Sequence, residues 1–331
     1  MENSSLPKGI KIKSDSHGLS PDPTPQPRVA VLMCTLDGSA YIRQQLGSIF
    51  TQSLRPSEIL ISDDGSTDQT RQILTQIAHA HPAARMRISE GPQRGYSANF
   101  FKLLTRVSND VDFVALADQD DVWLKDKLAR ACKALEGFAD RPALYGSATI
   151  VCDANLNNKY LSRAPDTKVG FGHALAQNFA GGNTMVLNAA ALALVQDVLG
   201  RNISVPVYDW FLYQLISGAG GEIVFDGEPS LLYRQHARNA IGAVRGIRPR
   251  LWRLRHLTQG RYRRWNDANL KALTQVSDLL SPTHRRDLRR VCEARTYPLI
   301  PRLRLLWRSR IRRFSIEGFL ALWVAVVLNQ F

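Results

Sequence analysis

Three carboxylates within four residues end an otherwise apolar run. The stretch DFVALADQDDVW (112–123) reads as a buried strand that stops at Asp118, Asp120 and Asp121. Residues two apart on an extended chain point to the same side, so Asp118 and Asp120 can face one ligand. Oxygen ligands without soft neighbours suit Mg²⁺ or Mn²⁺, which combine one or two carboxylates with substrate phosphates. We therefore expect a divalent ion that arrives with a diphosphate; a solvated acidic turn is the alternative.

A second acidic pair lies in SDDGSTDQT (62–70). A turn at Gly65, with Ser66 capping the next helix, accounts for part of this stretch. It leaves Asp63 and Asp64 unexplained, because one cap needs only one acceptor. A carboxylate after a nucleotide-binding strand accepts hydrogen bonds from ribose hydroxyls or base N–H groups. This stretch is therefore a second candidate ligand contact.

Both acidic stretches belong to a regular alternation of strand-like and helix-like segments. Apolar runs with strand character, each followed by a segment with helical spacing, recur at residues 28–34, 58–62, 85–89 and 112–118. Repeated β-α units predict an α/β fold, with a mostly parallel sheet and helices on both of its faces. Ligands of such sheets bind beyond the carboxyl ends of the strands, where both acidic stretches lie.

Another carboxylate, Asp209, opens an apolar helical pattern in VPVYDWFLYQLI (205–216). Asp before Trp-Phe-Leu is a favoured helix N-cap, and residue statistics alone favour that role. A carboxylate is also suited to take a proton from a hydroxyl as a general base. The residues by themselves leave both roles open.

The C-terminal quarter carries the positive charge. The chain of 331 residues has a formal net charge of +14, and residues 243–313 hold 19 arginines and one lysine against four acids. The remaining body is close to neutral. A pI near 10 with interleaved aromatics fits a nucleic-acid-binding protein superficially. No helix-turn-helix, RNP-like or Cys/His finger pattern occurs, however, so we expect no nucleic-acid partner.

We interpret residues 243–331 as an Arg-rich helical region that lies on an anionic membrane surface. Its longest apolar run, Gly318–Leu328, has 11 residues, fewer than the ~20 needed to cross a bilayer. Packing of this region on the body is the alternative.

The N-terminal segment and the cysteines bear on where the protein works. Residues 1–27 are polar and proline-rich without a signal peptide, which indicates a disordered leader. The four cysteines are scattered, which is typical of reduced thiols rather than of a disulfide frame or a zinc site. We expect a cytoplasmic protein, peripheral on the inner face of the cytoplasmic membrane.

Five motifs in one order resemble glycosyltransferase family 2: VAVLMCTLDGSAYIRQQLGSIFTQS, EILISDDGSTDQT, DFVALADQDDVWLKDKL, YDWFLYQLI and LLYRQHARNAIGA. The resemblance covers residues 28–242 and is closest to bacterial rhamnosyltransferase-type members of polysaccharide biosynthesis. It implies a GT-A fold and an inverting transfer of a sugar, with rhamnose as one candidate, from a nucleotide-diphosphate sugar. The implied acceptor is a hydroxyl of a glycan or lipid-linked glycan, and the implied cofactor is Mg²⁺ or Mn²⁺.

The resemblance also implies which residues bind the nucleotide. Thr35, Leu36 and Asp37 match the first nucleotide loop, although many members have Tyr and Asn where this chain has Leu36 and Asp37. That departure removes the aromatic side chain on which a base would stack. Asp64 matches the carboxylate that reads the nucleobase. Arg94 lies where members often hold a basic residue near the nucleotide.

For the diphosphate and the chemistry, Asp118 and Asp120 match the DxD pair, with Asp120 as a direct metal ligand. In YRQHARN (233–239), Arg234 is suited to bidentate phosphate contact, and His236 could complete the metal shell. Asp209 matches the general base of the family.

Two other classes of protein compete with this reading. A nucleotidyltransferase would want a basic, Gly-rich loop after the first strand, whereas CTLDGSAYI (34–42) has no basic residue before Arg43. A non-catalytic nucleotide-sugar-binding protein would keep the same motifs, with Asp209 as a helix cap only. Gly181-Gly182 in FAGGNTMVLN (179–188) would border the acceptor in the family, or form a simple bulge.

Overall fold

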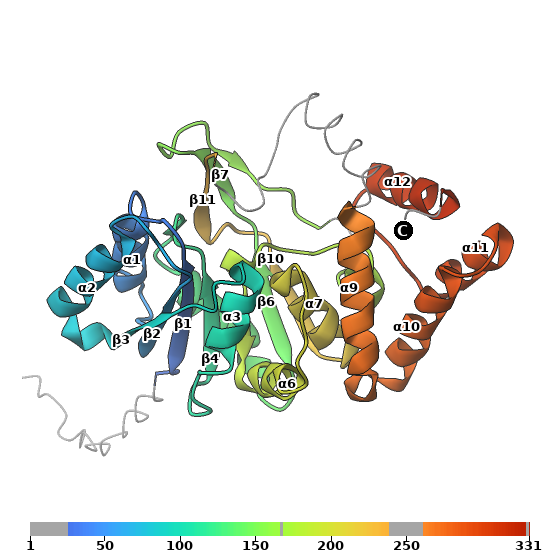
Figure 1. The fold of residues 1–331 in the computed structure, drawn as a ribbon, viewed down its shortest axis with the longest axis horizontal. Helices are drawn as coiled ribbons and strands as arrows, with labels where there is room; N and C mark the ends of the chain where they lie inside the picture. The colour runs from blue at the N-terminus through green and yellow to red at the C-terminus, as the bar shows by residue number, and fades with distance from the viewer. Residues whose placement is uncertain (1–25, 166–167, 238–260, 329–330) are drawn as a thin grey trace, which may run out of the picture.

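The computed structural model in Figure 1 describes residues 26–165, 168–237, 261–328 and 331. A sheet with helices on both sides makes up the body, and four further helices lie beside it. Apart from residues 26 and 27, the predicted leader lies outside the described residues. Residues 243–260 of the basic region also lie outside them.

A seven-stranded sheet forms the centre of the body. Its order is β10-β6-β9-β4-β1-β2-β3, and neighbouring strands are parallel except where β9 pairs with β4 and β6. The strands are β1 (Val29–Thr35), β2 (Glu58–Asp63), β3 (Met86–Glu90), β4 (Phe113–Ala117), β6 (Ala143–Ser147), β9 (Val186–Asn188) and β10 (Glu222–Asp226). Thr35 at the end of β1 is in register with Asp63 at the end of β2, so both strands finish level.

Helices cover both faces of this sheet because successive strand residues point to opposite sides. Val31 and Met33 of β1 pack with α1, α2 and α4, whereas Ala30 and Leu32 pack with α3, α6 and α7. The helices of the body are α1 (Ile42–Phe50), α2 (Thr70–Ala80), α3 (Tyr96–Leu104), α4 (Lys127–Leu135), α5 (Phe171–Ala174), α6 (Ala189–Leu199) and α7 (Tyr208–Gly218). The predicted α/β fold is confirmed.

A small second sheet brings distant residues to the acidic cluster. Its order is β5-β11-β7-β8, formed by β5 (Val122–Trp123), β7 (Ile150–Asp153), β8 (Tyr160–Leu161) and β11 (Leu231–Gln235). Strand β5 directly follows Asp121 and pairs antiparallel with β11. The chain after residue 230 therefore returns to the carboxylates that end β4.

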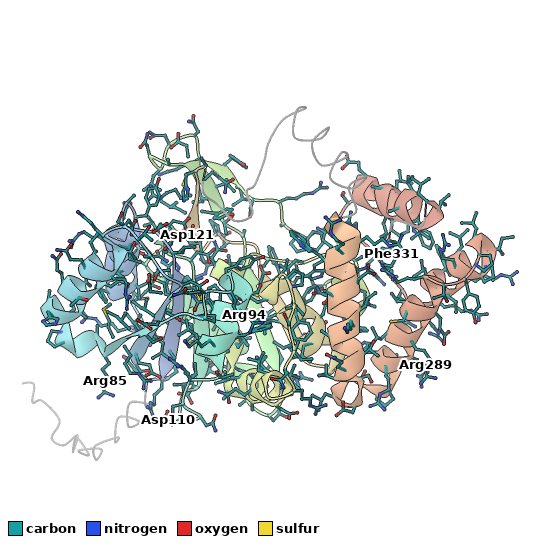
Figure 2. All side chains as sticks on the ribbon, in the orientation of Figure 1. Arg85, Arg94, Asp110, Asp121, Arg289 and Phe331 are labelled. Carbon is teal, nitrogen blue, oxygen red and sulfur yellow. The ribbon has the colours of Figure 1, made fainter. Side chains whose placement is uncertain are left out.

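The C-terminal region is helical, as expected, and it packs on the body. It contains α9 (Arg261–Gln275), α10 (Pro282–Ala294), α11 (Leu299–Arg308) and α12 (Ile316–Val327). Figure 1 shows α9 beside α7, with the other three helices on the outer side of α9. Leu273, Val291 and Ile311 are buried in the same core cluster as α7. Figure 2 shows Phe331, which is also buried in this cluster, and Arg289, which is exposed on α10.

Within the described part of the chain, no helix has the length and apolar character needed to cross a membrane. The apolar run Gly318–Leu328 forms most of α12. All four cysteines are free thiols.

Candidate active site

A cavity of about 900 Å³ lies at the edge of the central sheet where the parallel strands end. Six residues expected from the sequence line it: Thr35, Leu36, Asp64, Asp118, Asp120 and Asp209. Among the described residues, its lining does not include four others: Asp37, Arg94, Arg234 and His236. Cavities of this size hold small-molecule ligands and cofactors.

The acidic cluster lies at the end of β4, in the middle of the sheet. One carboxylate oxygen from each of Asp118, Asp120 and Asp121 lies within 4.8 Å of the others. Burial, followed by the charges of Asp121 and Asp120, raises the pKa of Asp118 well above its usual value. Burial and Asp120 raise the pKa of Asp121 to about 7. Asp118 is half-buried, and Asp120 and Asp121 are buried. Carboxylates that repel one another, and that offer only hard oxygen donors, fit a divalent cation whose charge favours their ionised forms.

A buried lysine, Lys127, places a positive charge close to this cluster. Lys127 is 0% exposed, and its ammonium group donates to the carbonyl of Asn183 (2.7 Å) and lies 4.4 Å from the ring centroid of Trp123. The Asn183 amide donates in turn to the Asp121 carboxylate (2.6 Å). Burial lowers the pKa of Lys127 to about 7, against the opposing effect of Asp121 and Asp118. The sequence carries no signal for this role of Lys127, because lysine at the start of a helix is ordinarily solvated.

Arg234 and His236, at the end of β11 and just after it, both contact Asp120. Nε2 of His236 lies 2.8 Å from a carboxylate oxygen of Asp120, and its ring stacks on Tyr41. Arg234 is buried, with Nε donating to the Asp120 carbonyl (2.8 Å) and Nη2 to the Gln44 side chain (2.6 Å). In this structure the guanidinium therefore holds the backbone of the acidic loop. The expected phosphate contact of Arg234 stays a prediction.

Gln119 connects the acidic loop to the loop after β1. Its side-chain oxygen accepts from the N–H of Leu36, and its side-chain nitrogen donates to the carbonyl of Leu36, each at 2.9 Å. A Cβ on Gly38 would lie 2.2 Å from the Gln119 oxygen, so a larger residue there would displace this side chain from its two bonds to Leu36. In the sequence Gln119 lies between Asp118 and Asp120. The residues around it do not indicate that its side chain bonds to Leu36, which is far away in the chain.

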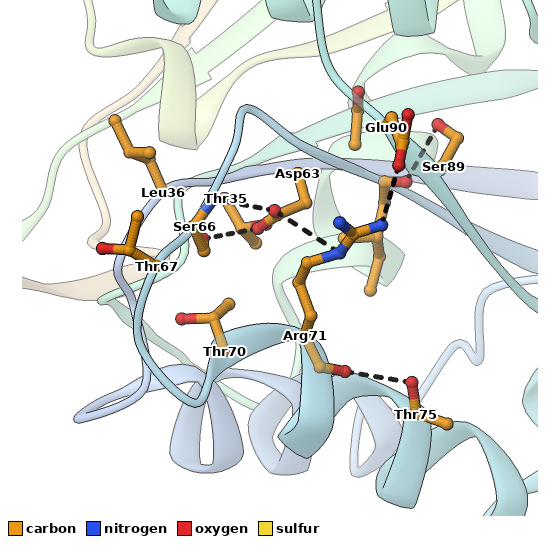
Figure 3. Close-up of polar contacts among 12 residues, drawn as sticks. Thr35, Leu36, Asp63, Ser66, Thr67, Thr70, Arg71, Thr75, Ser89 and Glu90 are labelled. Atoms are coloured by element: carbon orange, nitrogen blue, oxygen red, sulfur yellow. Dashed lines mark hydrogen bonds and ion pairs between the residues drawn. The ribbon is translucent and has the colours of Figure 1, made fainter. Parts of the chain in front are cut away.

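Asp63 and Asp64 of the second stretch have different roles. Figure 3 shows Asp63, whose carboxylate accepts from the hydroxyls of Thr35 (2.7 Å) and Ser66 (2.6 Å) and lies 3.9 Å from Nε of Arg71. Asp63 is 2% exposed, so it fixes the loop between β2 and α2. Asp64, in contrast, lines the cavity.

Asp64 also organises the loop that contains Arg94. Its two carboxylate oxygens accept from the backbone N–H groups of Gln93 (2.6 Å) and Gly95 (3.1 Å). Arg94, labelled in Figure 2, is exposed between them. The loop that carries Arg94 is thus attached to the candidate nucleobase contact, although Arg94 itself is not part of the lining.

Asp37 adopts a left-handed backbone conformation with φ of 48° and shapes the loop after β1. Its N–H donates to the hydroxyl of Ser66 (2.9 Å), and its carboxylate accepts from the N–H of Thr67 (2.8 Å). These bonds join the loops after β1 and β2. Asp37 therefore positions Leu36, which is 51% exposed and lines the cavity.

Asp209 is the second residue of α7, whose N-cap is Val207, so Asp209 is not the cap that residue statistics favour. Its carboxylate accepts from the N–H groups of Trp210 (2.7 Å) and Gly182 (2.9 Å). Burial raises the pKa of Asp209 to about 6, and these hydrogen bonds oppose the shift. A Cβ on Gly182 would lie 2.2 Å from the Tyr208 hydroxyl, which explains why glycine occupies the loop facing Asp209.

The chain matches the family model for glycosyl transferase family 2 over residues 30–199. It is 28% identical over 255 residues to dTDP-rhamnosyl transferase RfbG of Shigella flexneri, covering 75% of this chain and 84% of that protein. It is 24% identical over 158 residues to the GalNAc(5)-diNAcBac-PP-undecaprenol beta-1,3-glucosyltransferase of Campylobacter jejuni, covering 47% of this chain and 50% of that protein. The structure is similar to that of S. aureus TarS 1–349 in complex with UDP-GlcNAc, with a TM-score of 0.52, 14% identity, and coverage of 86% of this chain and 89% of that one.

The family match and the curated glycosyltransferase relatives, together with the GT-A-like fold, show a glycosyltransferase that uses a nucleotide-sugar donor. The family match spans more than half of the chain, and the chain belongs to glycosyltransferase family 2.

Proposed function

We propose that the protein is an inverting, metal-assisted glycosyltransferase in which Asp209 is the general base. One observation carries the proposal: the half-buried Asp209 carboxylate lines the same cavity as Asp118 and Asp120. A base and a metal site on one cavity are what direct displacement at an anomeric carbon requires. The domain organisation proposed with it is a glycosyltransferase body at 28–242 and a C-terminal region at 243–331.

On the donor side, the loops after β1 and β2 would bind the nucleoside. Thr35 and Leu36 line the cavity beside Asp64, whose carboxylate is suited to a base N–H or to ribose hydroxyls. Leu36 offers an apolar surface to the base in place of an aromatic ring. Asp37 would act by holding Leu36, and Arg94 by adding positive charge at the nucleotide end.

Asp118 and Asp120 would hold the divalent ion, with His236 completing the set next to Asp120. A bound Mg²⁺ or Mn²⁺ supplies charge that stabilises the departing nucleoside diphosphate. Lys127 holds the acidic loop against the loop that contains Asn183, so the carboxylates keep their positions. Arg234 holds the same loop through the Asp120 carbonyl.

On the acceptor side, Asp209 would take the proton of the attacking hydroxyl. The hydroxyl oxygen bonds to the anomeric carbon, the bond from that carbon to the diphosphate oxygen breaks, and the proton passes to the Asp209 carboxylate. Because attack comes from the face opposite the leaving group, the configuration at the anomeric carbon inverts. The N–H groups of Gly182 and Trp210 fix the direction of the carboxylate before the acceptor arrives.

We further propose a dTDP-rhamnose-type donor and a lipid-linked acceptor. The similarity to RfbG, named as a dTDP-rhamnosyl transferase, supports the donor. The glucosyltransferase of C. jejuni carries a PP-undecaprenol acceptor in its name, which supports the acceptor class. Acceptors of this kind would bring the protein to the inner face of the cytoplasmic membrane.

The outer surface of α11 and α12 supports contact with such a membrane. Seven large apolar side chains of α11, α12 and the residue after α12 are exposed: Leu299, Ile300, Trp307, Leu320, Val324, Val327 and Leu328. Exposed arginines accompany them at Arg304, Arg308 and Arg310. Apolar residues flanked by arginines match an interface with anionic lipid headgroups.

A thermal-shift screen tests the donor and the metal together. dTDP, UDP and GDP, with their sugars, are added with Mn²⁺, with Mg²⁺ and with EDTA. Binding to the folded state raises the Tm by mass action. We expect dTDP-rhamnose with a divalent ion to give the largest increase, and EDTA to remove it. Equal shifts with all three nucleotides, or shifts that survive EDTA, would contradict the donor or the metal respectively.

A further inference from the structure

The cavity extends along the sheet, and strand order gives its two ends. Asp64 follows β2, and the lining continues past β4 to Ser147 of β6 and Phe225 of β10. Strands β2 and β10 are five neighbours apart, which at ~4.8 Å per strand is roughly 24 Å. The end at β1 and β2 is the proposed nucleotide end. The end at β6 and β10 therefore remains for the other substrate.

The C-terminal region helps to build this second end. Trp265 of α9 and Arg313, between α11 and α12, both line the cavity. Helix α9 packs against α7, and α7 packs against β6 and β10. The segment with Arg313 is anchored on α5, because Phe314 stacks on His173 with centroids 4.1 Å apart. Nε of Arg313 donates to the carbonyl of Ala176 (3.3 Å).

Positive charge in the lining is confined to this end. Among the described residues, the cationic side chains of the lining are Arg163 and Arg313. Arg163 follows β8 and lies 3.7 Å from the carboxylate of Glu317, in the first turn of α12. Both arginines are therefore close to the start of α12.

An exposed apolar face begins next to these arginines. Four residues of the α12 segment are 51–63% exposed: Leu320, Val324, Val327 and Leu328. Their spacing places them on one side of the helix. Leu322 and Val326, on the other side, are each 2% exposed and pack in the core. The exposed face therefore continues outward from the cationic end of the cavity.

We propose that Arg313 and Arg163 bind the phosphate that links the acceptor sugar to its lipid, and that the lipid chain lies along the exposed face of α12. This inference rests on the proposed function and adds a specific phosphate site to it. A guanidinium binds phosphate with two parallel hydrogen bonds, so two arginines suit a phosphate ester or diphosphate. The apolar face removes part of the lipid chain from water. The sugar then lies inside the cavity, toward Asp209.

Binding of farnesyl diphosphate in EDTA tests the site without the metal. Titration calorimetry is carried out on the full chain, because EDTA prevents a diphosphate from binding through the metal site. We compare Arg313→Gln and Arg163→Gln with Arg312→Gln, which removes the same charge from an exposed neighbour outside the lining. Loss of a charge-assisted hydrogen bond should weaken binding about tenfold or more for the first two, and less than about twofold for Arg312→Gln.

Each result decides one part of the inference. Equal weakening by Arg312→Gln, or no binding to the unaltered protein in EDTA, overturns the phosphate site. Inorganic pyrophosphate that binds as tightly as farnesyl diphosphate overturns the role of the lipid. Arg163 is exposed, so Arg163→Gln remains informative if Arg313→Gln fails to fold. Metal-dependent nucleotide binding, measured on the same samples, reports separately on the proposed function.

Discussion

At Asp209, burial and hydrogen bonding act in opposite directions on one carboxylate. Removal from water raises its pKa, and the N–H groups of Trp210 and Gly182 lower it, with a result of about 6. A general base works best when its pKa lies just below the working pH, because it is then ionised yet still able to accept a proton. The start of α7 supplies the N–H of Trp210, and the loop before β9 supplies the N–H of Gly182.

Replacing this carboxylate separates catalysis from folding. In Asp209→Asn the amide oxygen can accept from one N–H group, but the NH₂ group cannot accept from the other. We expect a loss of stability of about 1 kcal/mol and a fall in kcat on the order of 10² to 10⁴. Donor binding should be unchanged, because the nucleotide loops are elsewhere. Transfer at the unaltered rate in a folded variant would exclude Asp209 as the base.

The same pKa predicts a pH dependence. Below about pH 6, Asp209 carries a proton and cannot accept the one from the acceptor hydroxyl. With saturating substrates, kcat should therefore fall about tenfold per pH unit below pH 6 and level off above it. Asp209→Glu should keep an acid limb with a shifted midpoint. A limb that stays at the same pH in this variant would belong to another group.

Replacing Asp120 tests whether the acidic cluster binds the metal ion. Asp120→Asn removes a charge from the cluster and should weaken Mn²⁺-dependent nucleotide binding by tenfold or more, measured by calorimetry. Asp126→Asn is a matched control, since Asp126 is exposed nearby and outside the cluster. Equal binding by the two variants would mean that the cluster does not hold the ion.

At the scale of elements, the site is assembled by loops that follow different strands. Gln119 joins the loop after β4 to the loop after β1, and Lys127 joins the start of α4 to the loop before β9. Because parallel strands end at the same edge, these loops meet without any long excursion of the chain.

Removal of the buried ammonium tests this assembly. Lys127→Met leaves Asp118 and Asp121 without the nearby positive charge, and we expect a loss of about 3 kcal/mol or more in urea unfolding. Mn²⁺ should restore more stability to this variant than it adds to the unaltered protein, because it replaces the missing charge. Lys125→Met, at an exposed neighbour, should change little. Equal stability of both variants would show that Lys127 does not support the cluster.

The strands and the conspicuous carboxylates of the site could be predicted from the sequence, because local patterns encode them. Apolar runs followed by segments with helical spacing predicted strands β1 to β4. Asp118, Asp120, Asp64 and Asp209 are identifiable because a carboxylate at a strand end or helix start is conspicuous. The roles of Gln119 and Lys127 depend on partners such as Leu36 and Asn183, far away in the chain. No local pattern records such pairs. Arg234 shows the same limit, because an arginine that looks available to phosphate is surrounded by protein acceptors.

At the scale of the whole molecule, the C-terminal region belongs to the same core as the body. Leu288, Leu306 and Phe314 are buried in the cluster that also contains α3 and α7. The sequence left open whether this region packs on the body or on a membrane. The structure shows the packing, and α11 and α12 keep an apolar outer face as well. Deleting residues 314–331 would remove core residues, so surface substitutions are the better test.

Changing the outer face should therefore weaken membrane contact without unfolding the protein. We expect Trp307→Ser with Leu320→Ser to reduce co-sedimentation with anionic phospholipid vesicles at least fivefold, because both side chains are exposed and apolar. High salt should reduce it further by screening the arginines. Leu161→Ser, at an exposed leucine outside these helices, is the control. Unchanged sedimentation of the double variant would exclude this face as the contact.

The return of β11 to the acidic loop has a consequence for how the molecule folds. His236 contacts Asp120 across 116 positions of the chain, and Arg234 reaches the same residue across 114. Contacts of such long range form late, because closing a large loop costs entropy before any contact compensates it. The β1–β4 half can therefore collapse while its acidic loop is still unfinished. Recovery of metal affinity during refolding would then lag behind recovery of helix content, and would mark the moment at which the second sheet closes.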